Sequence, residues 1–116
     1  FLSALEINPG SAATMYELAN ILQQSQDVQH ALLYSKKAAS IEPDNIWYQV
    51  LYLNCLKDSR KWQDAATGYQ KLIKKYPDNI EFYFELSNAY LYLNKPGDAI
   101  KVYDDIEKRF GSDKEI

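Results

Sequence analysis

The chain has 116 residues, of which 47% are apolar and 25% are charged, with a net charge of −3 at pH 7. This length fits one domain with one elongated core and leaves no room for a second domain. A net negative chain whose basic residues form only short pairs, such as Lys36-Lys37 and Lys74-Lys75, is not expected to bind nucleic acid. No apolar stretch has the length of a membrane span, and no secretion signal opens the chain.

A period of 34 residues runs along the chain. The residues that recur at this interval are Ala31, Ala65 and Ala99, then Pro9, Pro43 and Pro77, with Gly111 where a fourth proline is due. A fixed period of this length indicates supersecondary units that bury their apolar faces by stacking on one another. We therefore expect the function to lie on a surface and not in a cleft.

The chain order of elements follows from this period. Residues 1–9 match the end of the last helix of a preceding repeat. Units then begin near Ala12, Ile46 and Ile80, which gives repeats of about 12–45, 46–79 and 80–113 within one domain over residues 10–116. Each unit holds two apolar segments of helical length, separated by polar turns at 25–27, 58–60 and 94–98. The predicted fold class is all-α, with about three helical hairpins stacked into a superhelix (solenoid).

Helix ends carry matching signals. Between units, Pro43 and Pro77 stop one helix, and the Asp-Asn pair after each proline caps the next. Pro96 suits the first turn of a helix, where its missing N–H is not needed. Local signals and the global period thus agree.

The third unit shows the core pattern most clearly. Its first helix carries a buried stripe at i, i+3, i+4 and i+7, made of Tyr83, Leu86, Ser87 and Tyr90, and its second helix continues the stripe with Ala99, Tyr103 and Ile106. Two helices are expected to cross closely at Ala99, so a large side chain there should split the hairpin.

These patterns resemble the tetratricopeptide repeat, whose signature places Trp, Leu, Gly and Tyr in the first helix and Ala, Phe and Pro later. The matching positions are Met15, Leu18, Ala19, Leu22, Ala31, Ser35 and Pro43 in unit one; Gln49, Tyr52, Leu53, Leu56, Ala65, Tyr69 and Pro77 in unit two; and Tyr83, Leu86, Ser87, Tyr90, Ala99, Tyr103 and Gly111 in unit three. Three positions depart from the pattern: Gln49 and Ser35 replace aromatic residues, and Leu53 replaces a small one.

Both ends of the array are expected to expose apolar faces. Phe1, Leu2 and Leu5 lack a partner helix at one end, and Val102, Ile106 and Phe110 lie on a helix that another repeat or a polar cap usually covers. The sequence therefore allows self-association through the open helical ends.

No catalytic or metal site is expected. Cys55 is the only cysteine and is interpreted as a buried structural thiol, while the only histidine, His30, begins a different helix. No nucleophile, base and orienting group recur together, and no glycine-rich phosphate loop is present, so we expect neither enzymatic activity nor a cofactor.

A candidate binding surface is the stripe beside the core stripe in the first helix of each unit. This inner stripe comprises Ala13, Tyr16, Asn20 and Gln23; Trp47, Val50, Asn54 and Lys57; and Glu81, Phe84, Asn88 and Leu91. Asparagine recurs in register at Asn20, Asn54 and Asn88, and its carboxamide both donates and accepts hydrogen bonds. Such a ladder suits the backbone of an extended peptide. The alternative is that these asparagines fix helix contacts or face water.

Trp47 also has two interpretations: a binding hot spot, or packing against the preceding repeat. The groove is expected to be acidic, because four acidic residues lie beside the stripe and Lys57 is the main exception; the acidic residues are Glu17, Asp58, Glu81 and Glu85. An acidic groove favours a neutral, aromatic-accepting or basic segment. Family members that capture a C-terminal carboxylate use basic residues on this stripe; here Tyr16, Val50 and Phe84 stand in the lysine places, so such a clamp is not expected.

The sequence therefore predicts a non-catalytic interaction module that binds a peptide or protein segment through Tyr16, Asn20, Trp47, Asn54, Lys57, Phe84 and Asn88. The alternative is a structural scaffold or oligomerisation segment of a longer repeat protein. The tyrosine-rich units and their Pro-Asp-Asn junctions are similar to bacterial tetratricopeptide proteins, some of which work at the cell envelope. That resemblance leaves the cytoplasm and the bacterial envelope or periplasm both open as compartments.

Overall fold

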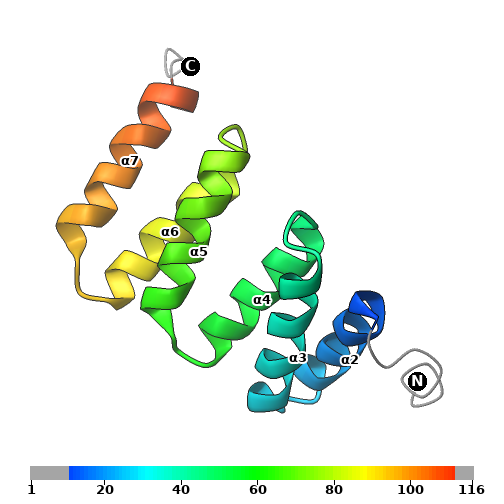
Figure 1. Ribbon diagram of the computed structural model, residues 1–116. Helices are drawn as coiled ribbons and strands as arrows, with labels where there is room; N and C mark the ends of the chain where they lie inside the picture. The colour runs from blue at the N-terminus through cyan, green and yellow to red at the C-terminus, as the bar shows by residue number, and fades with distance from the viewer. Residues whose placement is uncertain (1–10, 112–116) are drawn as a thin grey trace. The chain divides into compact units, whose positions relative to one another are not determined.

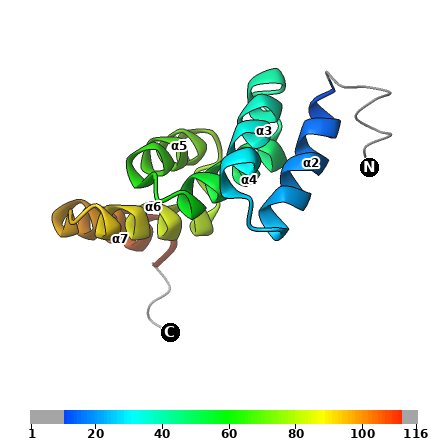
Figure 2. The same cartoon turned by 90° about the horizontal axis from the view of Figure 1, so that it is seen from below.

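A computed structural model describes residues 11–111, which fold into helices without any strand. The helices are α2 (Ala12–Gln24), α3 (Val28–Ile41), α4 (Ile46–Asp58), α5 (Trp62–Lys75), α6 (Ile80–Tyr92) and α7 (Pro96–Phe110). Figures 1 and 2 show them in chain order from blue to red. The predicted helical segments and turns are confirmed within this part of the chain.

The described residues group into two compact units, unit 1 up to residue 60 and unit 2 from residue 61 onward. In unit 1, α3 packs against both α2 and α4, and α2 also contacts α4. In unit 2, α6 packs against both α5 and α7 (Figure 1). The boundary between the units falls in the turn after α4, within the predicted repeat 46–79.

Helix starts follow the predicted capping chemistry. The Asn45 Oδ1 accepts hydrogen bonds from the backbone N–H groups of Trp47 and Tyr48, at 3.0 and 3.3 Å. Asn79 Oδ1 accepts in the same way from Glu81 N, at 3.1 Å. Each bond satisfies an amide at a helix end that has no partner inside the helix. Pro96 begins α7, as its position predicts.

The turn inside each predicted hairpin holds one residue with a left-handed backbone. These residues are Gln26, Arg60 and Asn94, with φ of 64°, 60° and 60°. They are spaced by the repeat period, and none is glycine. The turn between the two helices of each predicted repeat therefore uses the same backbone conformation three times.

The alanines of the period are all buried. Ala31 and Ala65 are fully buried, and Ala99 is 2% exposed. Ala31 belongs to a core cluster with Ala19, Leu51 and Cys55, in which α2, α3 and α4 meet. A small side chain at this point lets the three backbones approach closely without leaving a void.

Residues that depart from the repeat pattern are accommodated individually. The Gln49 Nε2 donates to the carbonyl oxygens of Ala39 and Pro43, both at 3.1 Å, and so ties α4 to the end of α3. Ser35 is buried and donates its hydroxyl to the Leu32 carbonyl at 3.0 Å. Leu53 is buried. The polar replacements thus make hydrogen bonds in place of aromatic packing.

Two predictions about α7 are wrong. Tyr103, expected in the core, is 45% exposed, and Val102, expected on an open face, is buried. Ile106 and Phe110 are half-buried, and the Phe110 ring packs edge-on against Tyr83 with centroids 5.4 Å apart. The core-facing side of α7 therefore contains Ala99 and Val102, whereas Tyr103 lies outside it. Phe1, Leu2 and Leu5 lie outside the described residues.

Candidate functional site

In unit 1, the inner stripe lies on two adjacent helices, α2 and α4. The Gln23 Nε2 donates to Asp58 Oδ2 at 3.1 Å, which joins the C-terminal ends of these helices. Near their N-terminal ends, the rings of Tyr16 and Tyr48 pack with centroids 5.0 Å apart. These contacts at both ends keep the stripe residues of α2 beside those of α4, so the two sets form one continuous surface in unit 1.

The predicted site residues of unit 1 differ in exposure. Tyr16, Asn20, Asn54 and Lys57 are half-buried, whereas Trp47 is 70% exposed. Packing of Trp47 against the preceding repeat is therefore not what the structure has. The backbone of Trp47 is fixed because its N–H donates to the cap residue Asn45 at 3.0 Å. An exposed indole thus stands on a rigid helix start.

In unit 2, α6 carries the equivalent residues Phe84 and Asn88. Phe84 is 40% exposed, and its ring lies 6.2 Å from that of Tyr103, centroid to centroid. Asn88 is exposed, unlike Asn20 and Asn54. The three asparagines share a repeat position but not an environment.

A groove that the sequence reasoning missed lies in unit 2, with a volume of about 560 Å³. It runs between α5 and α7, which both pack on α6. Its lining comprises Thr67, Gln70, Lys71, Ile73 and Lys74 of α5; Tyr83, Leu86 and Tyr90 of α6; and Asp98, Lys101, Val102 and Asp105 of α7. Lysines recur at i, i+3 in α5, a spacing that places both on one helix face and that was visible in the sequence.

The buried thiol is confirmed as a core group. Cys55 is fully buried in the cluster with Ala19, Ala31 and Leu51. Burial raises the pKa of the Cys55 thiol, the Asp58 carboxylate raises it further, and a hydrogen bond with Ser35 lowers it by less than burial raises it. A thiol that resists ionisation is a poor nucleophile and a poor metal ligand.

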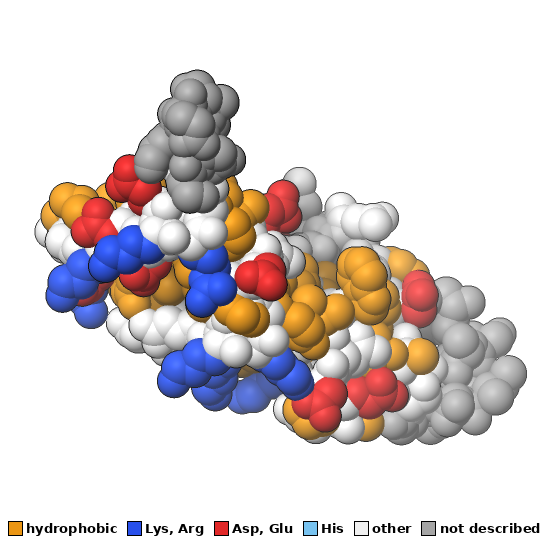
Figure 3. All heavy atoms as spheres, turned by 90° about the horizontal axis from the view of Figure 1, so that it is seen from above, with side chains coloured by type: hydrophobic (Ala, Val, Ile, Leu, Met, Phe, Trp, Pro, Cys, Tyr) orange, Lys and Arg blue, Asp and Glu red, His pale blue; other side chains and the backbone are white. Residues whose placement is uncertain are grey.

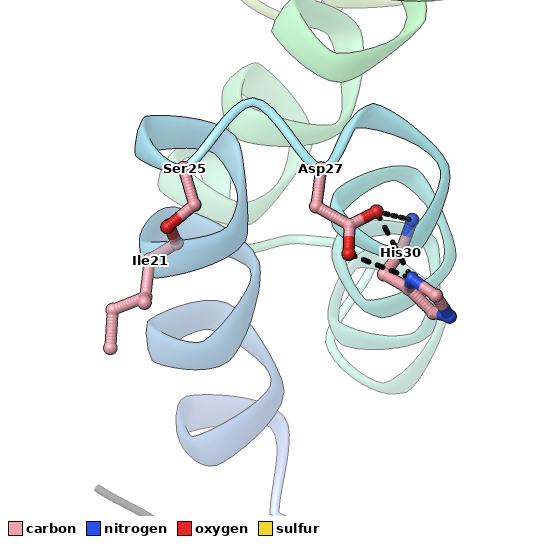
Figure 4. A network of polar contacts seen from close by, with 4 residues as sticks. All are labelled: Ile21, Ser25, Asp27 and His30. Carbon is pink, nitrogen blue, oxygen red and sulfur yellow. Dashed lines mark hydrogen bonds and ion pairs between the residues drawn. The ribbon is translucent and has the colours of Figure 1, made fainter.

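His30 has a local partner instead. Its Nδ1 lies 2.9 Å from Asp27 Oδ2, and the Asp27 carboxylate also caps α3 by accepting from His30 N at 3.3 Å (Figure 4). On the other side of the same turn, the Ser25 hydroxyl donates to the Ile21 carbonyl at 2.9 Å. The histidine is thus part of a helix start and stays apart from the buried thiol.

Among residues 11–111, no group of three or more His, Cys, Asp or Glu side chains has the arrangement of a metal site. No helix in this range is long and apolar enough to cross a membrane. The surfaces that remain as binding candidates are the inner stripe and the groove between α5 and α7.

Models of known families match most of the chain. Three models, each described as a tetratricopeptide repeat, match residues 12–45, 50–79 and 69–101. No curated protein sequence matches the chain significantly.

Two solved structures share the fold. The MamA protein superposes with a TM-score of 0.82 at 16% identity, covering 96% of this chain and 61% of that chain. YrrB, described as a TPR protein with an unusual peptide-binding site, superposes with a TM-score of 0.71 at 19% identity, covering 99% of this chain and 59% of that chain. This chain therefore spans about three fifths of the length of either protein.

The family follows from three observations: the paired helices, the 34-residue spacing of their turns and the three family matches. The chain belongs to the tetratricopeptide repeat family.

Proposed function

We propose that this chain is a non-catalytic module that binds a peptide or protein segment along its inner stripe. The family match supports a protein–protein interaction module, and YrrB, a similar structure, is described as having a peptide-binding site. Proteins of this fold typically act through contacts with other proteins and not through catalysis.

The exposed side chain of Trp47 is the observation that carries the proposal. An indole that is 70% exposed leaves roughly 150 Å² of mostly apolar surface in water. At about 25 cal/mol per Å², covering that surface is worth up to ~4 kcal/mol before the costs of association. Exposed tryptophans on rigid backbones are typical centres of binding energy.

The amides supply the polar part of the recognition. Asn20 and Asn54 project from the neighbouring helices α2 and α4 and are half-buried, so their side chains lose little further freedom when a ligand binds. A carboxamide offers two donors and one acceptor to a peptide backbone. Lys57, on the same helix as Asn54, adds a positive charge. On α6, Phe84 and Asn88 repeat the aromatic–amide pair.

A selection experiment tests this proposal. Peptides of about twelve residues are selected from a random library on the whole chain, and their affinities are measured for Trp47→Ala and Asn54→Ala. Leu33→Ala on α3 is the control, because Leu33 is an exposed apolar residue that lies off the stripe. We expect at least tenfold weaker binding for Trp47→Ala, about threefold for Asn54→Ala, and no change for Leu33→Ala. Equal binding by all variants contradicts the assignment of the site.

A scaffold role is the second candidate, and one feature of unit 2 favours it. Ile100 and Tyr103 of α7 are 61% and 45% exposed, and the Tyr103 ring lies beside that of the exposed Phe84 of α6. An apolar face of this kind is what a further helix or a second copy covers in a repeat array. Light scattering during size exclusion across a concentration series tests it. The scaffold role requires oligomers that dissociate in Ile100→Asp, and a monomer at every concentration argues against it.

A further inference from the structure

The groove between α5 and α7 has an apolar floor. Leu86, Tyr83 and Val102 are buried or nearly so and form the bottom, between walls made by the polar sides of α5 and α7. A second hollow is lined by Ile73, Tyr83, Asp105, Lys108 and Arg109. It shares Ile73, Tyr83 and Asp105 with the groove and extends it toward the end of α7. The whole depression lies within unit 2.

Two tyrosines that line the groove, Tyr83 and Tyr90, are held in place by contacts within unit 2. Tyr83 donates its hydroxyl to the Pro77 carbonyl at 2.7 Å, and its ring packs edge-on against Phe110. At the other end, the hydroxyl of Tyr90 accepts a hydrogen bond from the Gln70 amide of α5. Both aromatic side chains are therefore fixed before any ligand arrives, which lowers the entropy cost of binding.

The walls carry mostly positive charge. Five basic side chains line the extended groove, against the two carboxylates of Asp98 and Asp105; the basic residues are Lys71, Lys74, Lys101, Lys108 and Arg109. The chain as a whole has a net charge of −3, so this surface is opposite in sign to the rest of the molecule. Figure 3 shows Lys and Arg side chains gathered over unit 2.

These cations are available to a ligand. Within residues 11–111, Lys71, Lys74 and Lys101 form no ion pair, and Arg109 has only a 3.4 Å contact with the highly exposed Asp78. Several unpaired cations around an apolar floor create a positive potential that attracts and orients an acidic segment.

We propose that this basic groove is a second docking surface, and that its occupant is an acidic segment of another protein in which Asp and Glu flank apolar side chains. The apolar side chains lie on the floor over Leu86 and Val102, while the carboxylates face the lysines of both walls. This surface uses α5, α7 and the side of α6 that carries Tyr83, whereas the inner stripe uses Phe84 and Asn88 of that helix. The apolar floor favours a peptide over a nucleic acid, because it offers a hollow for aliphatic side chains and Tyr83 is only 5% exposed, too little for base stacking.

Fluorescence anisotropy with defined probes tests the proposal on the whole chain. The first probe is a labelled twelve-residue peptide in which Asp and Glu flank two Leu and one Phe. A second peptide replaces every acidic residue by Lys, a third replaces the apolar residues by Ser, and a labelled single-stranded oligothymidine of similar charge is the fourth. We expect the first probe to bind, the Lys peptide not to bind, the Ser peptide to bind at least tenfold more weakly, and the affinity of the first to fall with added salt.

The decisive variants reverse charge at exposed positions. Lys71→Glu combined with Lys101→Glu should weaken the first probe at least tenfold. The matched control, Lys36→Glu with Lys37→Glu, makes the same change in net charge on α3 of unit 1 and should leave the affinity within twofold. Circular dichroism confirms that both variants stay helical.

Four results overturn the proposal: no binding of the first probe at about 1 mM, equal loss in both double variants, equal binding of the Ser peptide, or tighter binding of the oligothymidine, which assigns the groove to nucleic acid. None of them bears on the inner stripe, because Trp47→Ala should leave the acidic probe unaffected. The two proposed binding surfaces can therefore be tested and refuted independently.

Discussion

The left-handed turn residues give a sharp test of the repeat geometry. Gln26 and Arg60 hold φ of 64° and 60°, where an L side chain costs about 1–2 kcal/mol. Glycine avoids this cost but adds unfolded-state entropy of roughly 0.5–1 kcal/mol. We therefore expect Gln26→Gly and Arg60→Gly each to raise the free energy of unfolding by about 0.5–1 kcal/mol. Asn94→Gly should change the free energy of unfolding by only about a few tenths of a kcal/mol, because asparagine tolerates this conformation.

Urea unfolding followed by circular dichroism at 222 nm measures these changes. A gain of this size corresponds to a rise in the midpoint of about 0.5 M urea. Ser59→Gly is the matched control, because Ser59 sits directly before Arg60 with φ of −87°, where glycine brings only its entropy cost. Ser59→Gly should therefore lower the midpoint. If Arg60→Gly lowers it as much as Ser59→Gly does, the turn does not hold the left-handed conformation and the reasoning fails.

Three further predictions concern the core. Ala31→Leu should lower the free energy of unfolding by about 1–3 kcal/mol, because Ala31 is fully buried where helices cross, while Ala13→Leu on the exposed face of α2 should have little effect in the same urea assay. Cys55 should react with a disulfide reagent at pH 8 at least about 100-fold more slowly in the folded protein than in urea, since burial excludes the reagent and raises the pKa of the thiol; similar rates would show that the thiol is accessible. Burial, with the Glu85 carboxylate, raises the pKa of Tyr69, so its contribution to stability is fully present below the ordinary tyrosine pKa of about 10 and is lost as the pH rises above it. Tyr69→Phe should therefore flatten the fall in thermal midpoint between about pH 10 and pH 12, and an unchanged fall would assign the alkaline instability to other groups.

Local features of this protein could be predicted from its sequence because they depend on neighbours along the chain. The helix starts at Asn45 and Asn79 follow from the capping preference of asparagine, and the turns follow from the repeat period. Burial of Ala31, Ala65 and Ala99 was predictable from the repeat period, because small residues at a fixed interval indicate positions where helices pack closely. Burial of Cys55 also followed from its place beside Leu56 in an apolar helix.

The candidate surfaces could be predicted only in part. The periodicity of α2, α4 and α6 placed Asn20, Asn54 and Asn88 on one stripe, but their different exposures depend on which helices pack beside each one. The same holds for Trp47, whose two interpretations differ only in whether another helix covers the indole; at 70% exposed it is uncovered.

Only the tertiary structure decided which side of α7 faces the core, and therefore that Val102 is buried while Tyr103 is exposed. Adjacent residues on a helix point about 100° apart. The periodic pattern in the sequence therefore does not decide which of two adjacent apolar residues, such as Val102 and Tyr103, faces the core. The groove between α5 and α7 likewise required the structure, because its lysines come from helices about 30 residues apart in sequence. Local chemistry in this chain determined where helices begin, turn and end, whereas packing of separate helices determined which side chains remain available to a partner.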